Sequence, residues 1–258
     1  MTEKVDVSAA LASGYLTIQG RDERSLFSEC LFTTVDRLIT VDGPDGSGKG
    51  AISRKLKEQL AAIYGADNVL LVCSNRFDLS PKAREIGESL KRQPWLSPDS
   101  VRHNAHYLAA SMVNYQTVIS PALEAGKFVV IDSSEIRALV YILDGGTEAA
   151  VRSTLRWIKS GKATSHLLAG NRVLLHTCPD DCLENIRARG KMDYGDPTSV
   201  DEAQRRADCY CLVAQMMKGL RQDRPSNWID VTNPRVEKDV DAYLNQFVAE
   251  TIIPRLRL

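Results

Sequence analysis

A glycine-rich segment carries the clearest chemical signal in the sequence. It reads Gly43-Pro-Asp-Gly-Ser-Gly-Lys49, stands between an apolar run and an amphipathic stretch, and has the spacing G-x-x-x-x-G-K. Glycines let a backbone wrap around a polyphosphate, while loop N–H groups and the next helix N-terminus point at the anion. A lysine at this spacing reaches the β- and γ-phosphate oxygens. The pattern predicts a nucleotide-binding loop with contacts from Gly43, Asp45, Gly46, Ser47, Gly48, Lys49, Gly50 and Ala51.

One position of this loop departs from its common form. Many such loops carry Ser or Thr directly after the lysine, where the hydroxyl holds Mg²⁺. This chain has Gly50 there, followed by Ala51. Replacement of the missing hydroxyl by Ser47 or by Ser53 is a hypothesis that the sequence leaves open.

A carboxylate is a second candidate for the metal site. The apolar run at 127–131 ends in Asp132, and an acidic residue that ends a strand beside a phosphate-binding loop is well placed to hold Mg²⁺ or its water ligands. The sequence Asp132-Ser-Ser-Glu135 is also typical of a helix N-terminus, where Asp132 would be a cap. We favour the metal role because the phosphate-binding loop is present.

Three cations crowd the end of a predicted helix. Arg187, Arg189 and Lys191 surround Gly190, after the fourth apolar run. Cations in such a position neutralise the charge that spreads during phosphoryl transfer. A cationic helix C-terminus is also favourable by itself, through the helix dipole. The place of this segment in the chain favours the catalytic interpretation for Arg187 and Arg189.

The elements that must position these groups are readable from hydrophobic patterning. Five short runs lack the alternation of a half-exposed sheet and are typical of strands buried on both faces. They are RLITV at 37–41, VLLVC at 69–73, KFVVID at 127–132, RVLLHT at 172–177 and WIDV at 228–231. Apolar residues at helical spacing lie between them over 49–63 and over 101–121, with an end near Pro121, and follow the last run over 236–252.

Strands that alternate with helices predict an α/β fold with a doubly wound, five-stranded parallel sheet and helices on both faces. We expect one such domain over residues 37–258. Residues 1–36 precede the first strand and are expected to form an N-terminal extension without a place in the pattern.

Composition narrows the classes of partner. The 258 residues include 33 Lys and Arg against 33 Asp and Glu, so no bulk charge favours nucleic acid or an anionic membrane. The six cysteines have neither C-x-x-C nor zinc-ribbon spacing, which favours reduced thiols. The first residues are acidic and polar, and no apolar run approaches the ~18 residues of a membrane span. We expect a cytoplasmic protein without a membrane segment.

The order of these pieces resembles the thymidylate kinases, members of the nucleoside monophosphate kinase group of P-loop proteins, over most of residues 37–250. Asp42-Gly-Pro-Asp-Gly-Ser-Gly-Lys49 is similar to that family's E-G-x-D-G-x-G-K, whereas Gly50 is similar to the G-K-G of cytidylate and adenylate kinases. The stretch from Ser120 to Asp132 resembles the approach to the family's D-R-Y motif, and Arg187-Ala-Arg-Gly-Lys-Met-Asp193 resembles its lid.

The resemblance implies a P-loop kinase fold with a mobile lid after the fourth strand, at about 185–197. It also implies Mg·ATP as phosphoryl donor and a nucleotide 5′-phosphate as acceptor. Lys49, Arg187 and Arg189 would then be catalytic, and Asp132 would support Mg²⁺. Dimers are common in the family, so a homodimer is an expected assembly.

The acceptor side departs from the family pattern. Ser133 stands where D-R-Y has its arginine, and Leu108-Ala-Ala-Ser-Met112 replaces the F-x-A-x-R that contacts the base. Arg76 lies roughly at the family's R-E-P arginine, and Arg137, one helical turn beyond Ser133, is a candidate replacement for the lost guanidinium. Asp45 stands at the family's acidic loop residue near the 3′-hydroxyl, and Tyr141 stands at its aromatic residue beside the sugar. The resemblance therefore implies that the acceptor contacts are Asp45, Arg76, Arg137 and Tyr141.

Three functions stay open from the sequence. The favoured one is ATP-dependent phosphoryl transfer to a (deoxy)nucleoside monophosphate, in which small-molecule nucleotides are the substrates. A P-loop kinase of a nucleoside or non-nucleotide acceptor is consistent with the changed acceptor residues. A nucleotide-binding protein without catalysis is consistent with Gly50-Ala51 and Ser133.

Overall fold

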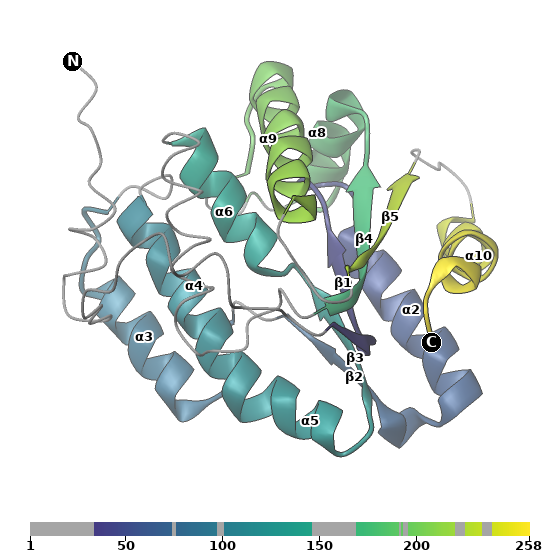
Figure 1. The fold of residues 1–258 in the computed structure, drawn as a ribbon. Coiled ribbons are helices and arrows are strands. Elements are labelled where there is room, and N and C mark those ends of the chain that lie inside the picture. The colour runs from purple at the N-terminus through teal and green to yellow at the C-terminus, as the bar shows by residue number, and fades with distance from the viewer. Residues whose placement is uncertain are drawn as a thin grey trace.

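A parallel sheet of five strands stands at the centre of the structure, as the sequence predicts (Figure 1). The strand order is β2-β3-β1-β4-β5, and every pair is parallel. The strands are β1 Val35–Asp42, β2 Val69–Val72, β3 Phe128–Asp132, β4 Ala169–His176 and β5 Asn227–Thr232. Each strand begins within three residues of the start that the sequence predicts.

The computed structural model describes residues 34–73, 76–96, 101–145, 169–190, 192, 196–219, 225–233 and 239–258. Most of the expected N-terminal extension, residues 1–33, lies outside this set, as do several residues of the expected lid at 191 and 193–195. The strand β1 begins at Val35, so the expected boundary after residue 36 falls inside the first strand.

Burial differs between the middle and the edges of the sheet. Side chains of β3, of β4 and of β1 from Leu38 onward are almost all buried, as predicted, whereas the first three residues of β1 are not. In β5, the last four residues alternate between buried and exposed, and the middle of β2 is half-buried. The prediction of full burial was therefore wrong for these two strands, because each is an edge strand with a neighbour on one side alone.

Helices cover both faces of the sheet (Figure 1). On one face α2 (Lys49–Tyr64), α10 (Val240–Phe247) and the π turn Val248–Ile252 pack against side chains such as Ile39, Val130 and Val173. The other face is covered by α4 (Val101–Asn114), α6 (Glu135–Asp144) and α9 (Val200–Lys218). The remaining helices are α3 Pro81–Lys91, α5 Ser120–Glu124, α8 Pro179–Ala188 and the short turns Ala66–Asn68 and Ile253–Arg255.

The long helical segment before β3 ends at Glu124, three residues past Pro121. After α4, a π turn spans Tyr115–Ile119, and the chain continues into α5 with Pro121 in its first turn. A proline is tolerated there because the backbone N–H that it lacks is not needed at the start of a helical segment. The wider turn thus lets the chain pass the proline and reach Glu124.

The register of the sheet aligns the ends of its central strands. Val41 of β1 is level with Asp132 of β3, and Asp42 is level with Leu174 of β4. Residues that follow these three strands therefore meet at one edge of the sheet, next to the point where the strand order reverses. In doubly wound folds, ligands bind at this carboxyl edge.

A buried polar network supports this edge. The Asp42 carboxylate accepts hydrogen bonds from the Ser134 N–H at 2.8 Å and from the Ser134 hydroxyl at 2.8 Å. Beside it, Arg172 and Glu135 form an ion pair of 3.0 Å in which both side chains are 2% exposed. Burial, together with the charge of Glu135, raises the pKa of Asp42 to about 6. The end of β1 is thus tied to the start of α6.

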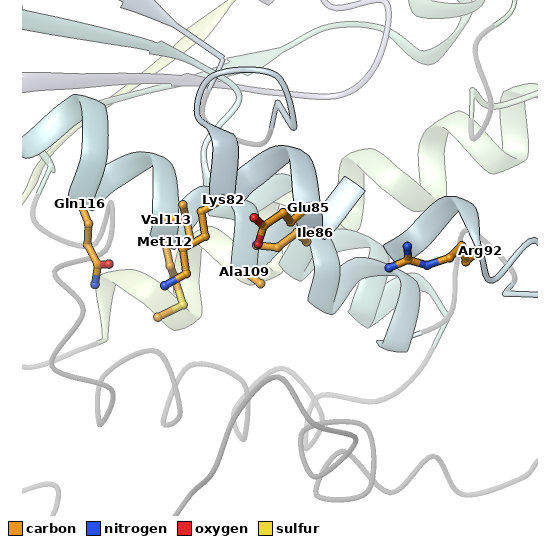
Figure 2. Close-up of a pocket in the computed structure, with 8 residues that line it drawn as sticks. All are labelled: Lys82, Glu85, Ile86, Arg92, Ala109, Met112, Val113 and Gln116. Carbon is orange, nitrogen blue, oxygen red and sulfur yellow. The ribbon is translucent and has the colours of Figure 1, made fainter. Parts of the chain in front are cut away.

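A groove of about 510 Å³ lies apart from this edge, between α3 and α4 (Figure 2). Apolar side chains line it from both helices, and charged side chains come from α3 and its C-terminal end. The lining comprises Lys82, Glu85, Ile86, Arg92, Ala109, Met112, Val113 and Gln116. The phosphate-binding loop contributes nothing to this groove, so we do not place the chemistry there.

Within the described ranges, no helix is long and apolar enough to cross a bilayer. The five cysteines that these ranges include are free thiols: Cys73, Cys178, Cys182, Cys209 and Cys211. Cys30 lies outside the described residues.

The raised pKa of Asp42 predicts a specific pH dependence of stability. The folded state holds the carboxyl proton more tightly than the unfolded chain, so the contribution of Asp42 is most favourable below about pH 4 and falls as the pH rises to about 6. Asp42→Asn removes this titration and keeps an acceptor for Ser134. Between pH 4 and pH 7, the free energy of unfolding of the wild type should fall by about 2 kcal/mol relative to the variant. Urea unfolding at both pH values measures it, and a constant difference would contradict the buried, raised carboxyl.

Candidate functional site

A cleft of about 570 Å³ opens at the carboxyl edge of the sheet. The loop after β1 forms one wall, and the ends of β3, α6 and α8 contribute charged groups from the other sides. Its lining includes Asp45, Gly46, Gly48, Lys49, Gly50, Ala51, Arg54, Asp132, Ser133, Arg137, Arg189 and Asn233. The structure therefore brings together most of the residues that the sequence singled out.

Two glycines give the loop its shape. Gly46 and Gly48 have φ values of +84° and +83°, in the left-handed region that other residues rarely adopt, and Gly48 is the N-cap of α2. A Cβ on Gly46 would lie 2.2 Å from the carbonyl oxygen of Cys182. The loop is therefore pressed against α8 at a point where no side chain fits.

Two amide side chains hold the loop from outside. Asn185 Nδ2 donates to the carbonyl oxygen of Gly46 at 2.9 Å, and Asn233 Nδ2 donates to that of Ser47 at 2.7 Å. These two contacts fix the loop carbonyls to α8 and to the residue after β5, and the Ser47 N–H donates within the loop to the carbonyl oxygen of Pro44 at 3.1 Å. Sequence patterns do not indicate either residue, because they lie 139 and 186 positions from the loop residues that they contact.

Lys49 stands at the first position of α2 and lines the cleft. Its ammonium group lies 3.0 Å from Asp45 Oδ1 and 3.1 Å from the carbonyl oxygen of Pro44. The side chain is thus folded back over its own loop, where it can reach phosphate oxygens that the loop N–H groups bind.

Asp45 links Lys49 to helix α6. Arg137 Nη2 lies 3.4 Å from the carboxylate, and the Tyr141 hydroxyl donates to Oδ2 at 2.9 Å. Burial alone would raise the pKa of Asp45, but the charges of Lys49 and Arg137 outweigh it and hold that pKa far below its ordinary value. Three expected contact residues, Asp45, Arg137 and Tyr141, therefore form one connected cluster.

Arg206 is a member of this cluster that sequence reasoning missed. Its guanidinium donates to the Tyr141 hydroxyl at 3.2 Å and lies 4.5 Å from the centre of the Tyr141 ring. The side chain is 3% exposed and also contacts Asp144 and Glu202. Arg206 lies on α9 and resembles many other helical cations, so the sequence pattern did not indicate this role.

Asp132 faces the first turn of α2. A Cβ on Gly50 would lie 3.1 Å from Asp132 Oδ2. Burial raises the pKa of Asp132, against the opposing charges of Lys49 and Arg137. The helix-cap alternative does not hold, because the hydroxyl of Ser134 caps α6 by accepting from the Ile136 N–H. Ser47 and Ser53 are fully buried and do not line the cleft, so the structure gives no support to either as a replacement hydroxyl.

Of the remaining predicted cations that the structure describes, one lines the cleft and two do not. Arg189 lines the cleft and pairs with the buried Asp196. Arg187 is exposed on the last turn of α8 and does not line the cleft. Arg76 is exposed and pairs with Asp78, also away from the cleft lining. Lys191 lies outside the described residues.

The side chains present fit a Mg²⁺ ion that arrives with a nucleotide. Proteins commonly hold such an ion through one or two carboxylates, phosphate oxygens and water. Asp132 supplies a half-buried carboxylate beside the phosphate-binding loop. Among the described residues, no group of three or more His, Cys, Asp or Glu side chains is arranged as an independent metal site.

Comparisons with known proteins agree with this geometry. No family model matches the chain. A probable thymidylate kinase of Methanoculleus marisnigri is 26% identical over 168 residues, which are 64% of this chain and 75% of that protein. The chain is thymidylate kinase-like.

Two further relatives are also thymidylate kinases, and a solved structure shares the fold. Thymidylate kinases from two strains of Ehrlichia ruminantium are 33% identical over 96 residues, which are 36% of this chain and 45% of theirs, so the match spans less than half of those relatives. The crystal structure of thymidylate kinase from Ehrlichia chaffeensis has a TM-score of 0.55 at 18% identity and covers 83% of this chain and 96% of its own. The predicted fold class is confirmed.

The close contact between Gly46 and α8 predicts a large cost for any side chain there. Gly46→Ala should lower the free energy of unfolding by at least about 2 kcal/mol more than Gly126→Ala, because a Cβ overlaps the Cys182 carbonyl in the first case. Gly126 is a matched control, since its φ is +83° and its nearest neighbour to a Cβ is 3.6 Å away. It should show the backbone strain alone, about 1 kcal/mol. Equal losses in chemical denaturation would contradict the tight contact.

Proposed function

We propose that the chain transfers the γ-phosphoryl group of ATP to the 5′-phosphate of a (deoxy)nucleoside monophosphate. The observation that carries this proposal is a single cleft lined by the phosphate-binding loop with Lys49 and by Arg137 of α6, which Asp45 and Tyr141 hold in place. Such a cleft can hold two phosphate-bearing molecules with their reacting ends together. The similarity to thymidylate kinases points to the same reaction class.

The donor side rests on the loop. Its N–H groups and the N-terminus of α2 bind the polyphosphate, and Lys49 neutralises charge on the transferring group. Bound Mg²⁺, held by Asp132 and the phosphates, would supply further neutralisation of the β- and γ-oxygens. Arg189 lines the cleft from the end of α8 and is placed to reach the transferring phosphoryl group once it separates from Asp196. In this proposal the protein positions the reacting groups and neutralises charge, and takes little part in covalent chemistry.

On the acceptor side, Arg137 takes the part that Ser133 cannot. Ser133 has a φ of +65° and is 3% exposed, so its short side chain stays at the wall of the cleft. Arg137, one turn further along α6, presents a guanidinium to the same cleft while Asp45 and Tyr141 fix its position. A planar guanidinium suits a phosphate because it can donate two parallel hydrogen bonds.

A second candidate is a P-loop kinase whose acceptor is a nucleoside or another hydroxyl compound. It is favoured by the α4 segment where the related enzymes contact the base, because Leu108 belongs to the core and Met112 lines the outer groove. With Arg76 also outside the cleft lining, fewer residues are left to hold a nucleoside monophosphate than the family pattern implies.

Homodimer formation and a cytoplasmic location, both expected from the sequence, stay predictions.

A substrate screen with a Lys49 variant tests the function. ATP consumption should appear with nucleoside monophosphates and be absent with nucleosides and small hydroxyl compounds. Lys49→Ala should lower that turnover by at least about a thousandfold, because it removes a charge that acts on the transition state. Lys57→Ala on the same helix, away from the cleft lining, is the control. Turnover confined to another acceptor would establish the second candidate, and ATP binding without turnover would establish loss of catalysis.

The acceptor assignment predicts different effects for two arginines. Arg137→Ala should raise the KM for the monophosphate by about tenfold or more, since a charge-assisted contact inside the cleft is lost. Arg76→Ala should change it less than about twofold, because Arg76 is exposed and bound to Asp78. Steady-state kinetics with varied monophosphate at saturating ATP measure both. A larger increase in KM for Arg76→Ala than for Arg137→Ala would indicate that the acceptor phosphate binds at Arg76.

A further inference from the structure

Two charged groups converge at Gly50, where the phosphate-binding loop lacks its usual hydroxyl. A Cβ on Gly50 would lie 3.1 Å from Asp132 Oδ2 and 3.7 Å from Arg54 Nη1. Arg54 is exposed and lines the cleft with both of them. The absence of a side chain at position 50 therefore leaves a space that is bordered by one carboxylate and one guanidinium.

Helix geometry explains why Arg54 reaches this space. Residues four apart lie on the same face of a helix, and a helical side chain leans toward the N-terminus over the preceding turn. Arg54 follows Gly50 by one turn of α2, and Gly50 has no side chain to block it. Its guanidinium can thus lie at the mouth of the phosphate-binding loop.

The other cations of the cleft already have anionic partners. Lys49 and Arg137 both contact Asp45, and Arg189 pairs with Asp196. The charge of Arg54 acts to lower the pKa of Asp132, but Arg54 forms no ion pair among the described residues. It is therefore a cation of this cleft that can bind an added anion without giving up an ion pair within those residues.

We propose that Arg54 binds the β- or γ-phosphate of the nucleotide and supplies, over Gly50, positive charge where other loops use a metal-binding hydroxyl. This inference rests on the proposed function, because it assumes a nucleoside triphosphate at the loop. Its consequence is that nucleotide binding depends less on a divalent cation than a hydroxyl-bearing loop would require.

Calorimetric titration of the full chain with ATP, in excess Mg²⁺ and in EDTA, tests the assignment. Wild type should bind in both buffers. Arg54→Ala should weaken binding at least about tenfold in EDTA and by a smaller factor in Mg²⁺, where the metal already neutralises part of the phosphate charge. Arg54→Lys should retain part of the EDTA affinity. Arg84→Ala, which removes an exposed arginine of α3, is the charge-matched control and should follow wild type.

Gly50→Ser is the complementary variant. Its side chain enters the space between Asp132 and Arg54, so it should weaken binding in EDTA and leave a larger ratio between the Mg²⁺ and EDTA affinities than in wild type. Equal losses for Arg54→Ala in both buffers, or the same affinity as Arg84→Ala, would overturn the role of Arg54. Absence of ATP binding by wild type in both buffers would instead overturn the proposed function itself.

Discussion

The parallel pairing of β1 with β3 is the constraint on which the site depends. Because Val41 is level with Asp132, the loop that follows one strand and the carboxylate that ends the other are neighbours before any ligand is considered. The buried hydrogen bonds between Asp42 and Ser134 then tie the start of α6 to the same edge. A slip of one residue in this register would turn Asp132 to the opposite face of the sheet.

Patterns local in the chain predicted much of this architecture. Apolar runs located all five strands, and the G-x-x-x-x-G-K spacing located the loop, because both signals lie within one short segment. The exposed faces of β2 and β5 were not predictable, since a strand's place at the edge of a sheet depends on the order of all strands. The continuation of the helix past Pro121 depends on a π turn that has no clear sequence signature.

The candidate site shows the same division. Lys49, Asp45 and Asp132 were found because each stands at a fixed distance from a motif or a strand end. Asn185, Asn233 and Arg206 were missed because their contacts with the site join segments that are far apart in sequence. Arg76 and Arg187 were selected by position in the chain, but exposed side chains beside a strand or at a helix end can turn either way, and the structure directs both away from the cleft lining.

The double contact of Asp45 has a further consequence for recognition. One carboxylate, 8% exposed, holds the ammonium of Lys49 and the guanidinium of Arg137, to which we assign the donor and acceptor sides in our proposal. The Asp45 carboxylate binds both cations as a phosphate group would. The side chains of Lys49 and Arg137 are therefore already ordered and lose little rotamer entropy when substrates bind. Because the two cations share this anchor, displacement of either one alters the electrostatic environment of the other, and occupancy of the two subsites becomes thermodynamically coupled.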